Sequence, residues 1–340
     1  MSARRPLSLR LLHRLCYDVL QRGPTAAERR AFTGAPADAV VPRLLRSREA
    51  MTEWFEEQLF YFLLLDRFRP GGDDIDRIPA RLQKGDLDAR AAIAELVLST
   101  GFSLRNPGND TFVTVVLEQC LGYRVQDKQH VRTLADGKKL YDGKKGRFLG
   151  EEGRSQADVV RIALRHEDFA RTLLDRHHRR LLQAPLPADS PAVAEVQRDF
   201  GRFFDVLATW LQSDAYLQAL DVRRGKSERQ FLRGLYTDLL ERPPGEDELR
   251  NLRNAMTAMA DPAPLRTVLA KVILDSTQAQ VPEFAAGDEA EFVTACFTRY
   301  LAREPVGGEL QAFVDVLRRP AAKPVHVVRA LVGSLEYQTY

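Results

Sequence analysis

Apolar residues recur along the chain at intervals of three and four positions, the spacing that places them on one face of an α-helix. Phe231, Leu235 and Leu239 form one such face, and the pattern stops at Arg242-Pro243-Pro244. Proline lacks an amide proton and moves its predecessor out of the helical region, so the sequence predicts that this helix ends here. Pro244 and the acidic residues 246–248 are typical of the first turn of a second helix.

The same junction occurs three times. Its frame is an apolar residue, Leu, any residue, Arg, any residue, Pro, three variable residues and Glu, and it occupies residues 19–28, 239–248 and 300–309. Residues 64–70 hold a looser copy with one extra residue before the proline. This recurrence predicts a repeated unit of two helices joined by a proline-containing turn.

A second frame consists of an apolar pair, one further residue and then a polar residue. Successive copies of this frame are 47 to 67 residues apart. The polar residues are Ser47, Ser99, His166, Ser213, Ser276 and Ser334. A serine hydroxyl at such a point can accept a hydrogen bond from an unpaired amide of the next helix. We therefore expect each of these residues to join two helices, and the aromatic residue often found three positions later to pack back on the preceding helix.

These junctions predict an all-α chain of tandem helical-repeat bundles stacked along the sequence, with one basic loop insertion. The valine-rich residues 111–117 have strand propensity, but they hold the place of residues 231–235 in their unit, so we expect a helix. One continuous helix is expected over residues 155–182. Its arginines are expected on a solvated face: Arg161, Arg165, Arg171, Arg176, Arg179 and Arg180.

The expected organisation is a succession of helical segments around the insertion. Arg223, Arg224 and Lys226 resemble a linker before the third repeat. The predicted segments are a first repeat (1–56), central buried helices (57–126), a Gly/Lys-rich insertion loop (127–158), a middle helical unit (159–226), a third repeat (227–281) and a C-terminal repeat (282–340).

The Leu-Leu-x-Arg-x-Pro-x-x-x-Glu frame followed by Ser-x-Glu-Tyr resembles the phycobilisome-linker-type helical domain and a related bacterial tandem repeat domain of unknown function. The match is best over residues 228–340, recognisable over 8–56 and weak over 57–227. The resemblance implies an all-α bundle that serves as an assembly or scaffold element, without a bound cofactor of its own. The chain departs from the frame where Gly23 and Glu304 stand in the place of Pro243.

Composition narrows the class of protein. The 340 residues are 44% hydrophobic and 29% charged, which is typical of a globular chain, and the longest apolar run, Leu59–Leu65, is too short to cross a bilayer. A net charge of +3 indicates neither a strongly basic nor a strongly acidic protein. Arg10, His13 and Arg14 interrupt the N-terminal apolar stretch, so we expect no secretion signal and a cytoplasmic location.

Metal and cofactor sites are not expected. His166-Glu167 begins like a zinc-protease motif, but the position four residues after His166 is Ala170. No two cysteines are close enough in sequence to form a metal-binding pair, so we expect reduced thiols in the core. The cysteines are Cys16, Cys120 and Cys296.

Residues 127–158 break the helical pattern and contain Asp-Gly-Lys-Lys twice. The glycines predict a turn-rich loop, and cations interleaved with aromatic residues could bind an anion or a partner. Five residues separate Gly137 from Gly143, where a phosphate-binding loop requires four. A plain solvated loop is the favoured interpretation. The candidate anion-binding or partner-binding residues are Lys138, Lys139, Tyr141, Lys144, Lys145 and Arg147.

The chain contains no nucleophile elbow, no dinucleotide fingerprint and no paired-carboxylate loop in the context that each requires. We therefore predict a non-catalytic helical scaffold that binds another protein or a second copy of itself. One alternative is a polyanion- or nucleic-acid-binding protein that uses the lysine-rich insertion. The other is an enzyme whose catalytic residues follow no recognisable motif.

Overall fold

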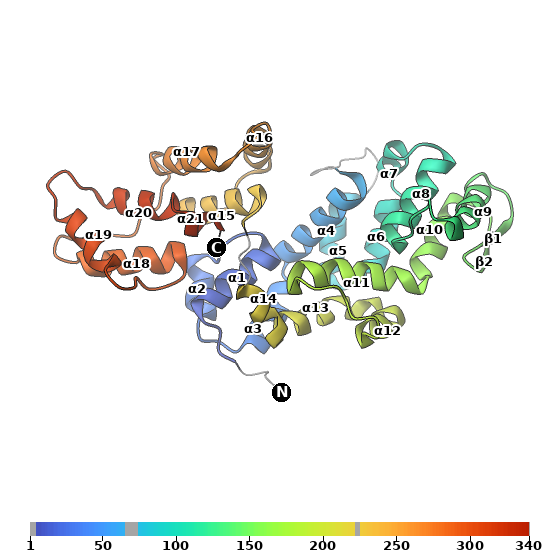
Figure 1. Cartoon of the computed structure of the whole chain (residues 1–340), viewed down its shortest axis with the longest axis horizontal. Helices are drawn as coiled ribbons and strands as arrows, with labels where there is room; N and C mark the ends of the chain where they lie inside the picture. Colours follow the sequence, from blue (N-terminus) through green and yellow to red (C-terminus); the bar gives the residue numbers. More distant parts are fainter. Residues whose placement is uncertain (1–4, 65–73, 222–224, 340) are drawn as a thin grey trace. The chain divides into compact units, whose positions relative to one another are not determined.

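The computed structural model describes residues 5–64, 74–221 and 225–339, and nearly all regular secondary structure in this part of the chain is helical (Figure 1). The all-α prediction is confirmed. The chain divides into two compact units: unit 1 comprises residues 1–41 and 220–340, and unit 2 comprises residues 42–219. The divisions fall inside α3 (Ala37–Leu45) and α14 (Asp214–Asp221). No described helix combines the length and the apolar character that crossing a lipid bilayer requires.

Unit 1 is built from short helices at both ends of the chain. Its remaining helices are α1 (Leu9–Leu20), α2 (Ala26–Phe32), α15 (Glu228–Leu240), α16 (Glu246–Thr257), α17 (Ala263–Leu274), α18 (Glu289–Leu301), α19 (Glu309–Leu317), α20 (Pro324–Val332) and α21 (Leu335–Thr339). The predicted apolar face of α15 is confirmed, because Phe231, Leu235 and Leu239 are fully buried. They share a core with residues of α17, α18, α20 and α21.

The proline junctions of unit 1 have the same backbone course in all three copies. The residue after the last helical position is left-handed in each: Gln21 (φ 57°), Glu241 (φ 52°) and Ala302 (φ 53°). This conformation stops the helix and turns the chain toward the next one. The predicted helix breaks after α1, α15 and α18 are therefore confirmed.

An Arg–Glu clamp closes each of these turns. The arginine guanidinium donates two hydrogen bonds to the glutamate six residues later, at 2.7 and 3.0 Å for Arg22–Glu28, 2.9 and 3.1 Å for Arg242–Glu248, and 2.7 and 2.9 Å for Arg303–Glu309. Each glutamate also accepts from the backbone N–H three residues before it, at 2.6 to 2.8 Å. The Arg and Glu of the frame thus recur because they hold one turn. Stacking of successive repeats stays a prediction.

The serine junctions are confirmed at four positions. The hydroxyl oxygens of Ser47, Ser99, Ser213 and Ser334 each accept from the backbone N–H three residues later, at 3.1 to 3.2 Å. The prediction is wrong at Ser276, whose hydroxyl donates to Ile273 O at 2.7 Å, and no helix begins until Glu289.

Unit 2 contains the longest helices. Its elements are α4 (Arg48–Leu63), α5 (Ile78–Lys84), α6 (Ala89–Val97), α7 (Thr100–Arg105), α8 (Gly108–Leu121), α9 (Val131–Tyr141), β1 (Gly146–Phe148), β2 (Glu151–Gly153), α10 (Gln156–Arg165), α11 (Glu167–Leu182), α12 (Pro191–Arg198) and α13 (Phe203–Leu211), with 3-10 turns at Ile75–Arg77, Lys128–His130 and Phe200–Arg202. The valine-rich residues 111–117 are helical within α8, as predicted.

A single helix over residues 155–182 was a wrong prediction, because the chain breaks at His166 between α10 and α11. The imidazole Nδ1 of His166 accepts from the backbone N–H of Asp168 at 3.3 Å, so the histidine serves as the N-cap of α11. His166 therefore occupies the junction that the serine frame assigned to it.

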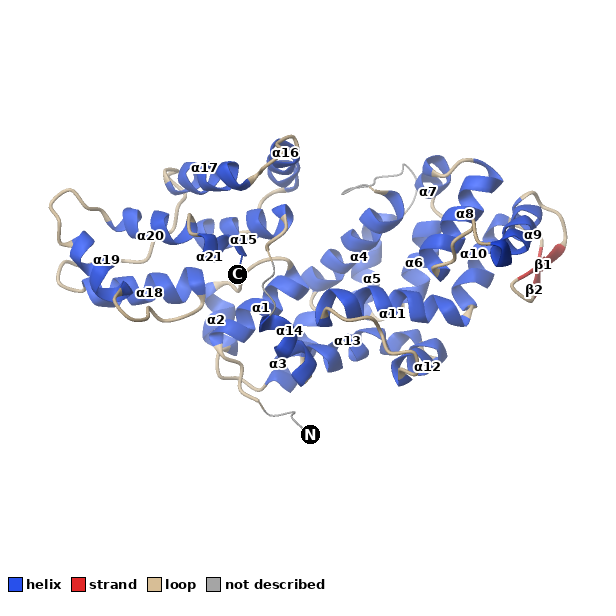
Figure 2. Cartoon of the chain, viewed as in Figure 1, coloured by secondary structure: helices blue, strands red, loops and turns tan. Residues whose placement is uncertain are grey.

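The prediction of a loop over residues 127–158 was also wrong. This segment forms α9 and the antiparallel hairpin β1–β2, which contains the strands drawn in Figure 2. Gly137 lies inside α9, where a Cβ atom would come within 2.5 Å of the Val113 side chain and 3.0 Å of the Phe148 ring. The glycine allows α9 to pack closely against α8 and the hairpin, so it reflects tight packing and not a turn.

Candidate functional site

The predicted basic residues lie together at the end of α9 and in the hairpin that follows it. Three lysines are paired with acidic side chains: Lys138 with Asp110 at 2.8 Å, Lys139 with Asp136 at 2.9 Å, and Lys145 with Glu152 at 3.4 Å. Residues 127–158 carry eight lysines and arginines against six acids, a net charge of +2. Much of the local positive field is therefore neutralised.

The other predicted members of this site differ in exposure. Tyr141 is half-buried, with its ring 5.2 Å from that of Phe112, so one part of its surface belongs to the core. Lys144 and Arg147 are exposed, and Arg147 lies opposite Glu152 in the hairpin register. Of the predicted residues, the arrangement therefore offers two exposed cations outside an ion pair in the described structure, and no aromatic platform set for stacking on a base.

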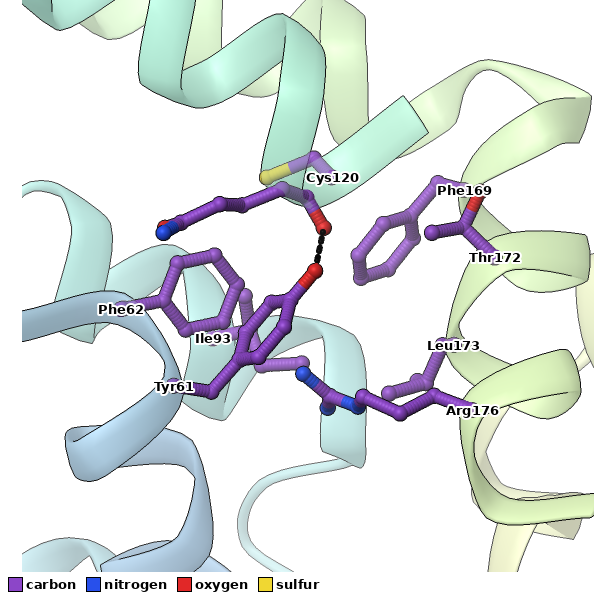
Figure 3. A pocket seen from close by; sticks show the side chains of 9 residues that line it. Tyr61, Phe62, Ile93, Cys120, Phe169, Thr172, Leu173 and Arg176 are labelled. Atoms are coloured by element: carbon purple, nitrogen blue, oxygen red, sulfur yellow. Dashed lines mark hydrogen bonds between the residues drawn. The ribbon is translucent and has the colours of Figure 1, made fainter. Parts of the chain in front are cut away.

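A small cavity lies in unit 2, between α4, α6, α8 and α11 (Figure 3). Its lining is Tyr61, Phe62, Ile93, Gln119, Cys120, Phe169, Thr172, Leu173 and Arg176. The volume open to the centres of water-sized spheres is about 10 Å³, which suits one water molecule. Burial raises the pKa of the Cys120 thiol to about 12, so this thiol stays protonated at neutral pH and is a poor nucleophile.

Arg176 packs over an aromatic ring in this cavity. Its guanidinium carbon lies 3.9 Å from the centre of the Tyr61 ring, and its Nη2 donates to Gln58 Oε1. The Tyr61 hydroxyl donates to the backbone carbonyl of Gln119 at 3.1 Å, and this hydrogen bond is the dashed line at the Tyr61 hydroxyl in Figure 3. Arg176 is half-buried, so its predicted place on a solvated helix face was wrong.

A second buried cation lies in unit 1. Lys226 has an exposed fraction of 6%, and its Nζ lies 4.1 Å from the centre of the Tyr337 ring and 4.5 Å from that of Tyr17. We call Lys226, Tyr17 and Tyr337 the Lys226 cage. Lys226 was predicted to be part of a linker and is instead buried; Arg223 and Arg224 lie outside the described residues.

Asp238 of α15 is fully buried next to this cage. The Tyr337 hydroxyl donates to Asp238 Oδ2 at 3.0 Å, and Arg29 Nη1 of α2 lies 3.9 Å from Oδ1. Burial raises the pKa of the Asp238 carboxyl, while the positive charges of Arg29 and Lys226 oppose that rise.

Two glycines explain how this polar cluster fits between helices. A Cβ atom on Gly234 of α15 would come within 2.2 Å of the Tyr17 hydroxyl oxygen, so glycine is needed for α1 to approach. A Cβ atom on Gly23 would lie 3.3 Å from His13 Nε2 and 3.5 Å from Asp238 Oδ1. Gly23 departs from the repeat frame where a side chain would enter the buried polar cluster.

The sequence analysis missed the Lys226 cage because its members come from three separate segments. Cys16, Cys120 and Cys296 are buried, which confirms the predicted core positions. Within residues 5–64, 74–221 and 225–339, no three His, Cys, Asp or Glu side chains are placed to hold a metal ion.

Comparison with protein-family models, curated proteins and solved structures finds no match to the chain. The resemblance to the phycobilisome-linker-type domain stays a prediction.

Proposed function

We propose that the chain is a non-catalytic helical assembly protein that binds an amphipathic helix of a partner protein on the outer face of α17. The observation that supports this proposal is the exposure of two large apolar side chains, Val268 (53%) and Val272 (59%), one turn apart on α17. Pro264, one turn earlier, is exposed as well. Residues spaced by four lie on one side of a helix, so the three form an apolar stripe.

The internal repeats provide a comparison for this stripe. The residues eight and four positions before the junction serine are Val268 and Val272 in the third repeat. The equivalent pair is Ala39 and Arg43 in the first repeat, and His326 and Ala330 in the C-terminal repeat; all four are exposed. The fold therefore does not require large apolar residues at these positions, which supports a binding role for the valines.

The charges around the stripe favour an apolar occupant. Asp261, Lys271 and Asp275 lie at its rim, and Asp275 is already paired with Arg329 at 2.6 Å. The rim thus carries both signs and little net charge. A partner helix with apolar residues at i, i+4 and i+8 and a mixed charged border is complementary to such a surface.

The polyanion alternative has less support, because three of the five predicted cations are paired with acids. An enzymatic role has no candidate nucleophile in the described cavity, which is the size of one water molecule.

The test is site-specific photocrosslinking of the full chain in its native cells. A photoreactive residue replaces Thr267, beside the stripe, or Ala330, at the equivalent face of α20. We expect a discrete crosslinked protein from position 267 only, lost in Val268→Asp/Val272→Asp and mapped by mass spectrometry to an amphipathic helix. Equal crosslinking from both positions, no crosslink, or a crosslink to a second copy of this chain would overturn the proposal.

A further inference from the structure

The Lys226 cage joins three helices that are distant in sequence. Tyr17 lies on α1, Lys226 directly precedes the N-cap of α15, and Tyr337 lies on α21. We propose that protonation of Lys226 loosens the contact of α1 and α21 with α15, so that unit 1 is closed more tightly in alkaline than in mildly acidic solution. The cage would then act as a proton-controlled lock.

The ammonium group of Lys226 has poor compensation for its burial. Its Nζ is enclosed, and none of the described residues supplies a hydrogen-bond acceptor to it. The two tyrosine ring faces attract a cation, but this attraction is weak beside the cost of removing a charge from water. A charge removed from water without an acceptor is costly, so the neutral amine fits this site better.

Some charges near Lys226 favour its protonation and others disfavour it. The carboxyl group of Asp238 favours the protonated lysine, but that group already accepts from Tyr337 and lies near Arg29. Arg14 of α1 and Arg266 of α17 disfavour it, and Arg266 also donates to the Lys226 carbonyl at 2.8 Å. Burial, with the two arginines, lowers the pKa of Lys226 to about 7 against the attraction of Asp238.

The sign of the effect follows from proton binding. An unfolded lysine has a pKa of 10.5, so between pH 7 and 10.5 the unfolded chain binds one proton more than the folded chain. Stability therefore rises with pH across this window, and below pH 7 the full cost of the buried charge is present. In the limit of one proton, the opening equilibrium changes about tenfold per pH unit.

The other titratable groups around the cage change the stability of unit 1 in other pH ranges or with the opposite sign. Burial lowers the pKa of His13 on α1, so its effect lies below pH 6.5. Burial raises the pKa values of Tyr17 and Tyr337 above 10, which places their effects in more alkaline solution. The raised pKa of Asp238 decreases stability as pH rises, and Arg299 of α18 donates to the Asp238 carbonyl at 2.7 Å.

The test is hydrogen exchange with mass spectrometry on the full chain between pH 6 and 9, corrected for intrinsic exchange rates. We expect residues 9–20 and 335–339 to open more as pH falls, by up to about tenfold per pH unit between 9 and 7. Peptides of α8 and α11 in unit 2 serve as the internal control. Lys226→Met should remove the rise in protection with increasing pH, both in the wild-type background and in Asp238→Asn, in which the opposing titration of Asp238 is absent.

Three results would overturn the proposal. One is the same pH dependence in Lys226→Met as in the wild type, and the second is an equal response in unit 2. The third comes from Lys226→Arg, which keeps its charge at every pH and should hold residues 9–20 in the more open state throughout. The proposal is contradicted if residues 9–20 of Lys226→Arg at pH 6 are as well protected from exchange as those of the wild type at pH 9.

Discussion

Arg176 in unit 2 and Lys226 in unit 1 both pack against tyrosine rings, and the two sites differ in what the cation can do. Arg176 of unit 2 contacts the Tyr61 ring and also donates to Gln58. Lys226 of unit 1 contacts two rings but has no acceptor among the described side chains and backbone groups. Arginine stays charged even where burial lowers its pKa, whereas a buried lysine can release its proton near neutral pH. The same aromatic contact therefore gives a permanent charge in one unit and a titrating one in the other.

The largest expected effect comes from Arg176→Met. The change removes a charge-assisted hydrogen bond and a cation–π contact, so we expect a loss of about 3 kcal/mol from the free energy of unfolding of unit 2. Denaturant-induced unfolding, followed by hydrogen exchange in the peptides of unit 2, measures this loss of stability. Arg132→Met is the matched control, because the Arg132 side chain is 94% exposed and its removal should change stability by less than about 0.5 kcal/mol. Equal effects of the two changes would show that Arg176 is not held as described.

The opposite sign is expected for Lys226→Met. At pH 7 the substitution removes the cost of a buried amine, offset in part by the lost ring contacts, so we expect a gain of about 2 kcal/mol in the stability of unit 1. The gain should shrink toward pH 10, where the wild-type lysine is neutral in the folded chain and its burial costs less. Unfolding curves at pH 7 and pH 10 measure the difference. A loss of stability at pH 7 would remove the contrast between the two cations.

The two units also differ in the side chains that hold their helix-ending turns, and a smaller change of stability is expected from mutations there. Unit 1 closes each turn with an Arg–Glu clamp, and unit 2 stops α11 at Gln183 (φ 56°) with Ala184 in the place of the arginine. There Asp175 Oδ1 accepts from the backbone N–H of Leu186 at 2.7 Å. The two units thus satisfy the same kind of turn with different side chains.

Glu309→Gln tests the clamp. The hydrogen bonds from Arg303 lower the pKa of Glu309 to about 2, so its contribution is present above pH 4.5 and is lost as pH falls through about 2. Because Glu309 is 35% exposed, solvent screening limits the expected loss at pH 7 to about 1 kcal/mol. Thermal unfolding at pH 7 and pH 2 measures it, with the exposed neighbour Glu304→Gln as the control. A loss that is as large at pH 2 as at pH 7 would contradict the assignment.

The smallest effect is expected at the hairpin of unit 2. Of the five predicted cations, Lys144 and Arg147 are exposed and form no side-chain ion pair in the described structure, so we expect the two together to contribute about −1 to −2 to the salt slope of binding to single-stranded DNA. Lys144→Ser/Arg147→Ser should reduce that slope toward zero in a fluorescence titration between 20 and about 200 mM salt. A steeper slope, unaffected by the double change, would place any polyanion site elsewhere.

Local chemistry explains why the helix junctions were predictable. A proline or a capping serine acts on the residues beside it, so the ends of α1, α15 and α18 follow from the frame alone. The same logic failed at Gly137, because the need for glycine there comes from Val113 and Phe148, which belong to other elements. Ser276 departs from the frame in another way: its hydroxyl donates to Ile273 O, as those of Ser213 and Ser334 donate to the residue three positions earlier, but no helix begins until Glu289.

The Lys226 cage was beyond the reach of local patterns. Lys226 follows two arginines in the sequence, a context typical of an exposed connection. Its burial depends on Tyr17 and Tyr337, each more than a hundred positions away along the chain. One signal was present: Gly234 in the middle of an otherwise strong helix indicates a close neighbour, which proved to be the Tyr17 hydroxyl.

Unit 1 is discontinuous, and this has a consequence for synthesis on the ribosome. Residues 1–41 emerge first, but their partners in unit 1 begin only at residue 220. All of unit 2 is translated in between, so it can fold co-translationally while α1 still lacks its neighbours. The nascent α1 therefore keeps its apolar face, including Leu12, Leu15 and Leu20, without its final cover during that interval. Chaperone binding to the nascent chain is expected to concentrate on this first helix.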